Sequence, residues 1–202
     1  MIRVTILYED EREPNAKGYG PHALIKQYLA DRMGVDPWTI SDEELLGIPK
    51  RGNGNVRKAC QKDLAKLAAS GGTVVAVYDA DQAHVLAQLP SGACKSQLIR
   101  GLKDGCDPEE KLVVVLLHRN LETVLTTLRA CVPSLVIDAT WDKAIQGKKL
   151  SERDQILVAA SKPTEATRAI RGKLCEQMPS LAYLIDKIER AWRGSIRTSS
   201  EE

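Results

Sequence analysis

Continuous apolar runs rich in β-branched residues recur along the first part of the chain. They cover residues 2–8, 73–81 and 111–117, and a shorter run lies at 46–49. Runs of this length that lack an apolar-polar alternation are typical of strands buried on both faces of a parallel sheet. The pattern therefore predicts three buried strands and a short additional strand at 46–49.

Segments with apolar residues at helical spacing separate these runs. They predict helices over residues 21–33, 56–67 and 95–103, with Gly34 ending the first and Gly71-Gly72 ending the second. Strands joined by helices of this length favour right-handed crossovers, which place helices on both faces of the sheet. We therefore predict an α/β fold with a mostly parallel sheet.

The pattern beyond residue 120 is mainly helical. It predicts a helix that begins at Asn120, an edge strand at 134–138, and helices at 151–160, 164–177 and 180–193. Leu184, Ile188 and Trp192 share the apolar face of the last helix, which covers either the sheet or a partner chain. The predicted organisation is a core over 1–130, a helical extension over 131–194 packed on that core, and a disordered tail over 195–202.

Composition narrows the class of protein. With 29 basic and 27 acidic residues among 202, the net charge is only +2, so contact with nucleic acid requires a local basic patch. Five cysteines without a C-x-x-C spacing argue against a disulfide framework and a zinc site. The first residues lack the features of a signal peptide, and no apolar run is long enough to span a membrane. We therefore expect a cytoplasmic protein with reduced cysteines and no membrane contact.

Two aspartates end the central apolar run, in the sequence Asp79-Ala80-Asp81. Carboxylates this close repel each other unless a cation lies between them, and ligands of open α/β sheets gather at the carboxyl ends of strands. The triplet therefore indicates a divalent metal. The alternative is that one aspartate only caps the following helix, as aspartate often does.

Other acidic residues follow the neighbouring strands. Glu9 and Glu13 come after the first run, and Glu122 lies just beyond the run at 111–117. Because parallel strands bring their carboxyl ends to one edge of the sheet, we expect these acids to lie near Asp79 and Asp81. His22, His84 and His118 are interpreted as packing or surface residues and are not assigned to the site.

A basic stretch precedes the second predicted helix. Residues 49–58, with the sequence PKRGNGNVRK, contain Lys50, Arg51, Arg57 and Lys58 together with two glycines and two asparagines. A glycine-containing turn before a helix N-terminus suits a phosphate group, although the P-loop pattern is absent. The alternative is an ordinary solvated loop.

The order of these motifs resembles the TOPRIM fold, a Rossmann-like fold, and in particular the small TOPRIM proteins related to the overcoming-lysogenization-defect (OLD) nucleases. The resemblance covers residues 1–130 and rests on Glu9 with Glu13, on Asp79 with Asp81, and on Glu122 preceded by Arg119. Two features depart from the family pattern. Asp10 stands where the family usually has glycine, and the chain has no Walker motif.

The resemblance implies hydrolysis of phosphodiesters with Mg²⁺ or Mn²⁺. It assigns Glu9, Asp79 and Asp81 as the central ligands and Glu13 and Glu122 as completing a second position, with Glu9 or Glu13 as an alternative base. The predicted phosphate contacts are Arg119, Lys50, Arg51, Arg57 and Lys58.

The same resemblance implies partners. OLD-type nucleases carry an ATPase on the same chain, so here a separate ATPase would be needed, and systems of this kind commonly defend bacteria against phages. Self-association is left open. The alternative function is a TOPRIM-like scaffold that binds nucleic acid or a protein without hydrolysis. A topoisomerase or primase is disfavoured, because 202 residues leave no room for their additional domains.

Overall fold

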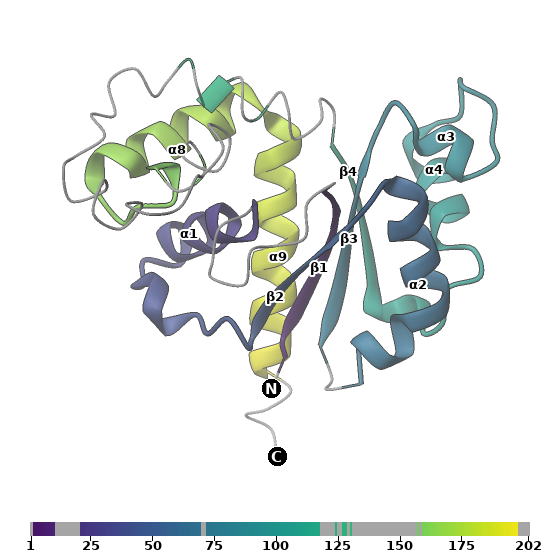
Figure 1. Ribbon diagram of the computed structural model, residues 1–202, viewed down its shortest axis with the longest axis horizontal. Coiled ribbons are helices and arrows are strands. Elements are labelled where there is room, and N and C mark those ends of the chain that lie inside the picture. Colours follow the sequence, from purple (N-terminus) through teal and green to yellow (C-terminus); the bar gives the residue numbers. More distant parts are fainter. Residues whose placement is uncertain are drawn as a thin grey trace.

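The computed structural model describes residues 2–10, 21–69, 72–117, 124, 127, 128, 130, 157 and 159–197. In this part of the chain, a four-stranded parallel sheet lies between two layers of helices (Figure 1). The predicted α/β class and the parallel sheet are confirmed, and the architecture is consistent with a Rossmann-like fold.

The strands follow the order β2-β1-β3-β4 across the sheet. Their bounds are Val4–Glu9 for β1, Leu45–Lys50 for β2, Thr73–Asp79 for β3 and Leu112–Leu117 for β4. From β1 the chain moves outward to β2 and then returns to the other side of β1 to form β3. The strand order therefore reverses between β1 and β3, which makes their carboxyl ends the topological switch point of the sheet.

Close backbone contact fixes the start of β3. The amide of Thr73 donates to the carbonyl of Arg3 at 2.9 Å, and a Cβ on Gly72 would lie 2.7 Å from the carbonyl oxygen of Ile2. Only glycine fits this approach without moving the backbone. Gly72 therefore allows β3 to pair with β1 from its first residue.

One face of the sheet is covered by α1 (Pro21–Met33), α9 (Pro179–Arg197) and, outside them, α8 (Glu165–Gln177) (Figure 1). Alternate side chains of β1, β3 and β4, such as Ile6, Val77 and Val115, pack into this layer. The opposite face is covered by α2 (Asn53–Leu67), α3 (Ala83–Leu86) and α4 (Lys95–Lys103). Short 3-10 helices at Pro37–Thr39 and Glu109–Lys111 complete the described elements.

The last helix belongs to the core of the protein. Leu184, Ile188 and Trp192 are buried against the sheet and α1, and α9 contacts β1, β3 and β4. The prediction that this face could bind a partner chain is therefore wrong, and the alternative that it covers the sheet is confirmed. The helix continues through Arg197, so its end lies beyond the predicted boundary at residue 194.

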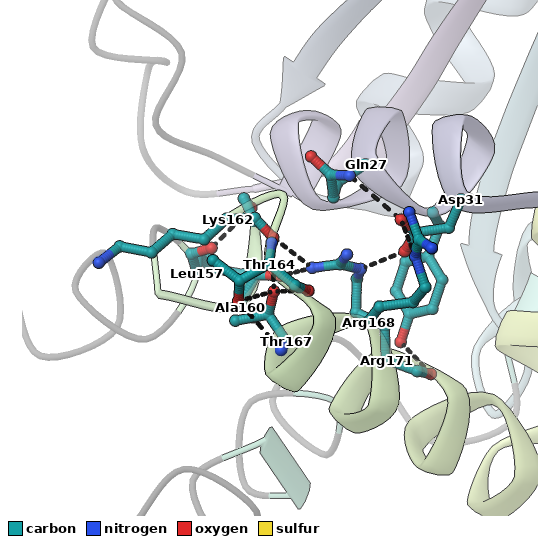
Figure 2. Close-up of polar contacts among 11 residues, drawn as sticks. Gln27, Asp31, Leu157, Ala160, Lys162, Thr164, Thr167, Arg168 and Arg171 are labelled. Atoms are coloured by element: carbon teal, nitrogen blue, oxygen red, sulfur yellow. Dashed lines mark hydrogen bonds and ion pairs between the residues drawn. The ribbon is translucent and has the colours of Figure 1, made fainter. Parts of the chain in front are cut away.

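A buried ionic cluster joins α1 to α8 (Figure 2). Arg171 is only 1% exposed, and its Nε donates to Oδ2 of Asp31 at 2.6 Å. Its Nη1 donates to the carbonyls of Ala160 at 2.6 Å and Lys162 at 2.9 Å. Thr164 caps α8 by accepting the amide of Thr167 at 3.3 Å. These contacts hold α8 against the outer side of α1.

Three predicted elements lie wholly or mostly outside the described residues. They are the edge strand at 134–138, the helix predicted to begin at Asn120 and the helix predicted at 151–160. Val124, Thr127, Leu128 and Ala130 of the first helix and Leu157, Ala159 and Ala160 of the second are described as helical. Val124 and Leu128 are buried in the same layer as α1 and α9.

Candidate functional site

The switch point of the sheet carries two acids. Glu9 is the last residue of β1 and Asp79 is the last residue of the adjacent strand β3. Both line one pocket, whose other walls are mainly apolar and come from β-strands, α1, α9 and the helical residue Val124. These wall residues are Tyr8, Leu24, Ile25, Val77, Leu117, Val124, Leu181 and Leu184. The expectation that acids after the first and third strands lie near each other therefore holds for Glu9 and Asp79.

Asp79 is contacted from the opposite layer by α2. The side-chain Nδ2 of Asn53 donates to Oδ2 of Asp79 at 3.5 Å, and its Oδ1 accepts the backbone amide of Asp79 at 3.4 Å. Gly52 precedes Asn53 with a φ of 82°, a conformation that favours glycine, and so starts α2 immediately after β2. The short turn brings the first residue of α2 to the end of β3.

Asp81 lies differently. The carbonyl of Asp79 accepts the amide of Gln82 at 3.3 Å, so the chain turns directly after β3. Asp81 is exposed in this turn and does not line the pocket with Asp79. Helix α3 has Gln82 at its N-cap without a side-chain cap. Neither aspartate therefore serves as the N-cap of α3, which was the alternative to a metal site.

The other three predicted residues, Glu13, Glu122 and Arg119, lie outside the described part of the chain. Among the described residues, no group of three or more His, Cys, Asp or Glu side chains is arranged to hold a metal. Glu9 and Asp79 are thus the two predicted ligands that the described structure brings to one pocket. Two carboxylates fit Mg²⁺, which commonly binds proteins through one or two carboxylates and completes its shell with waters and substrate phosphates.

The predicted basic residues divide into two groups. Lys50 ends β2 directly opposite Glu9 in the β1–β2 register, and Arg51 and Lys58 are exposed around the start of α2. Arg57 instead points into the helical layer, where its guanidinium donates to the carbonyls of Leu86 and Gly101. Those contacts join α2 to α3 and α4. They use guanidinium N–H groups of Arg57 that would otherwise be needed to bind a phosphate.

A histidine near the pocket was not assigned from the sequence. The Nδ1 of His22, in the first turn of α1, shares a hydrogen bond of 3.2 Å with the hydroxyl of Tyr8, which lines the pocket beside Glu9. Burial lowers the pKa of His22, against the opposing effect of Asp42. A Cβ on Gly47 would lie 2.4 Å from Cβ of His22, so glycine makes room for this ring above β2.

The sequence also did not indicate Asn53 or the role of α9 in the site. Asparagine is common in turns, so Asn53 does not stand out in the sequence. Its contact with Asp79, 26 positions later, is not indicated by any pattern in the neighbouring residues. Leu181 and Leu184 have the spacing of an ordinary packing face, yet they form part of the pocket wall. Both features depend on how distant segments pack together.

The site and strand order define a class: an α/β protein with a mainly apolar pocket, lined also by two acids, at the switch point of a parallel sheet. No family model, curated protein or solved structure matches the chain. The resemblance to TOPRIM proteins therefore rests on the residues quoted from the sequence. Within the described part of the chain, no helix has the length and apolar character needed to cross a membrane.

Proposed function

We propose that this protein is a divalent-metal-dependent nuclease. One observation carries the proposal: the adjacent ends of β1 and β3 place Glu9 and Asp79 in one pocket at the switch point. Ligands of open α/β sheets bind in this position, and carboxylate oxygens select hard cations such as Mg²⁺ and Mn²⁺.

In this proposal, Glu9 and Asp79 hold the cation. A bound Mg²⁺ or Mn²⁺ would supply Lewis-acid activation of the phosphodiester and of a water molecule. Lys50 and Arg51 would contact the neighbouring phosphates, since a cluster of acids alone repels a polyanion. Glu13, Glu122, Asp81 and Arg119 remain predicted participants on the sequence resemblance alone.

The proposed partners are nucleic acid and a separate ATPase. These 202 residues contain no Walker motif, and in this proposal the ATPase is a separate protein. A role in defence against phages is part of the same proposal and rests on the resemblance to OLD-type nucleases.

The second candidate is a scaffold that binds nucleic acid or a protein without hydrolysis. The exposure of Asp81 favours this candidate, as does the lack of a third metal-ligating side chain among the described residues of the site. Two carboxylates leave the cation more dependent on waters and substrate than a full protein shell would.

Cleavage assays distinguish the two candidates. Labelled single- and double-stranded DNA and RNA are incubated with the full chain in Mn²⁺, with and without a chelator. The informative variant is Asp79→Asn, which removes the charge and keeps the shape of the side chain. Asp63→Asn is the matched control, because Asp63 is exposed on α2 away from the pocket.

The nuclease proposal predicts cleavage by the wild type and by Asp63→Asn, and its loss in the chelator and in Asp79→Asn. Melting curves establish that each variant is folded. Cleavage by Asp79→Asn at the wild-type rate would contradict the proposal. Binding without cleavage by the wild type would support the scaffold.

A further inference from the structure

A buried amide contacts the proposed metal ligand Asp79. Asn53 is polar yet only 3% exposed, and it is the first residue of α2. Its Nδ2 donates to the Asp79 carboxylate at 3.5 Å, and its Oδ1 accepts the Asp79 backbone amide at 3.4 Å. Both ends of one side chain are therefore directed at a single residue on the neighbouring element.

This contact is not explained by the helix itself. The N-cap of α2 is Gly52, and no side chain caps the helix. Asn55, two residues further on, is exposed and donates to the carbonyl of Arg51 within the same turn. Asn53 thus makes a contact between elements, whereas Asn55 makes a local one of the kind common at helix starts.

Packing fixes Asn53 in place. Val56, Cys60 and Leu64 of α2 are buried against the sheet, and the contact at the helix start lies on this packed element. An amide anchored in this way can restrict both the backbone and the carboxylate of Asp79. Groups that hydrogen-bond to a metal-ligating carboxylate set its orientation and contribute to metal affinity.

The chemistry of the partner matters as well. An amide donates a hydrogen bond without adding charge, so Asn53 can orient the carboxylate without contributing a positive charge of its own. A lysine or arginine in this place would add a positive charge that competes with a metal. Asparagine at this position is therefore suited to orient Asp79 as a metal ligand.

We infer that Asn53 is a positioning residue that orients Asp79 for a divalent cation. The inference rests on the proposed function, because it assumes that Asp79 is a metal ligand. The inference adds a residue of α2 to the proposed metal site. The β2–α2 turn would then support the metal site as well as supply the proposed phosphate contacts of Lys50 and Arg51.

Calorimetric titration of the full chain with Mn²⁺ tests the inference. The variants are Asn53→Ala, the matched control Asn55→Ala, Asp79→Asn, and the double variant Asn53→Ala with Asp79→Asn. We expect Asn53→Ala to bind Mn²⁺ about 10- to 100-fold more weakly, as is typical when a supporting hydrogen bond to a ligand is lost. Asn55→Ala should bind like the wild type.

The double variant should bind no more weakly than Asp79→Asn, because Asn53 acts through Asp79. Mn²⁺ should also raise the melting temperature of the wild type more than that of Asn53→Ala at equal concentration. A purely structural role would lower the melting temperature without changing this increment. If Asn53→Ala does not fold, Asn53→Ser tests the same prediction, because serine suits a helix start and is too short to make both contacts.

The outcomes separate the two proposals. If the wild type and Asp79→Asn bind Mn²⁺ equally, the proposed metal site itself is wrong. If Asp79→Asn abolishes binding while a folded Asn53 variant binds like the wild type, the inference about Asn53 is overturned and the metal site stands.

Discussion

Two acids of the same type, Asp31 and Asp79, sit in contrasting surroundings. Asp31 lies between α1 and α8, where Arg171 contacts it at 2.6 Å, and Arg168 and Gln27 each contact it at 3.2 Å (Figure 2). Asp79 lies at the end of β3, is contacted by the neutral amide of Asn53, and lines a pocket. The fold thus surrounds Asp31 with fixed cations and places Asp79 at the ligand-binding edge of the sheet.

The difference shows how the position of a carboxylate separates structure from function. Cations on α8 balance the charge of Asp31, so this acid joins two helices. Asp79 ends a strand at the switch point, where ligands of α/β sheets bind. Asp31 lies within helix α1 and Asp79 ends strand β3, and the distinction comes from the elements that pack around each one.

The largest expected effect is on the buried cluster. Arg171→Ala leaves Asp31 without its 1%-exposed partner and also removes donors to the carbonyls of Ala160 and Lys162, which precede α8. Loss of one member of a buried ion pair typically costs about 3–5 kcal/mol of unfolding free energy. Urea denaturation of the wild type and the variant measures the difference.

Arg168→Ala is the matched control for that measurement. Arg168 contacts the same carboxylate at 3.2 Å but is 65% exposed. Exposed pairs contribute roughly 0–1 kcal/mol, so this variant should unfold near the wild-type midpoint. Equal effects of the two variants would show that Arg171 does not hold α8 to α1 as described.

Arg57 offers a second, smaller test of the same distinction between structural and exposed charges. Arg57→Ala removes hydrogen bonds from a charged donor to the carbonyls of Leu86 and Gly101. Hydrogen bonds to charged groups contribute about 1.5–3 kcal/mol, so the variant should be destabilised by roughly that amount. Lys58→Ala, an exposed neighbour on α2, should change stability little. If Arg57→Ala does not change the free energy of unfolding, the Arg57 hydrogen bonds do not stabilise the fold, and Arg57 would again be a candidate for phosphate contact.

The basic residues around the β2–α2 turn are expected to act on binding, where Arg51 and Lys58 are exposed and Lys50 is half-buried. A variant with Lys50, Arg51 and Lys58 replaced by alanine should bind nucleic acid more weakly and with a flatter salt dependence. Each lost phosphate contact lowers the slope of log K against log salt by about 0.9 on duplex DNA and about 0.7 on a single strand. Titration on one oligonucleotide in Ca²⁺ compares the slopes. Identical slopes would show that the turn is a solvated connection without phosphate contacts and would direct attention to Arg119.

The smallest expected effect concerns His22. Burial holds its pKa below the ordinary value of 6.5, so the unfolded chain binds a proton that the folded protein does not in the window between the two values. The free energy of unfolding should therefore fall as the pH falls through this window. His22→Asn keeps a polar atom near Tyr8 and cannot titrate, so it should lose this part of the pH dependence. Denaturation curves at several pH values around 6 compare the two proteins, and parallel pH profiles would contradict the assignment.

Much of the fold follows from local patterns. Unbroken apolar runs identified β1, β3 and β4. Helical spacing identified α1, α2, α4, α8 and α9, with glycines marking the ends of α1 and α2, although α9 continues beyond its predicted end. The short run at 46–49 predicted β2, which spans Leu45–Lys50. These elements are predictable because a helix buried on one face, or a strand buried on both faces, has apolar residues at regular spacing in the sequence.

The site was predictable in part. Glu9 and Asp79 follow from the rule that parallel strands bring their carboxyl ends together, since both residues end strands that proved adjacent. The turn after Asp79, which leaves Asp81 exposed, depends on backbone geometry that an aspartate pair does not specify. Asn53, His22 and the wall from α9 depend on contacts between distant segments, which no local pattern records.

Glu9 and Asp79 together are proposed to hold a divalent cation, and a crystal soaked in Mn²⁺ shows where such a cation binds. The anomalous scattering of manganese locates the ion without reference to activity. We expect a peak within direct coordination distance of the Glu9 and Asp79 carboxylates, and no such peak in crystals of Asp79→Asn. A wild-type crystal without a peak at this pocket, or with manganese bound only at acids elsewhere, would contradict the proposal.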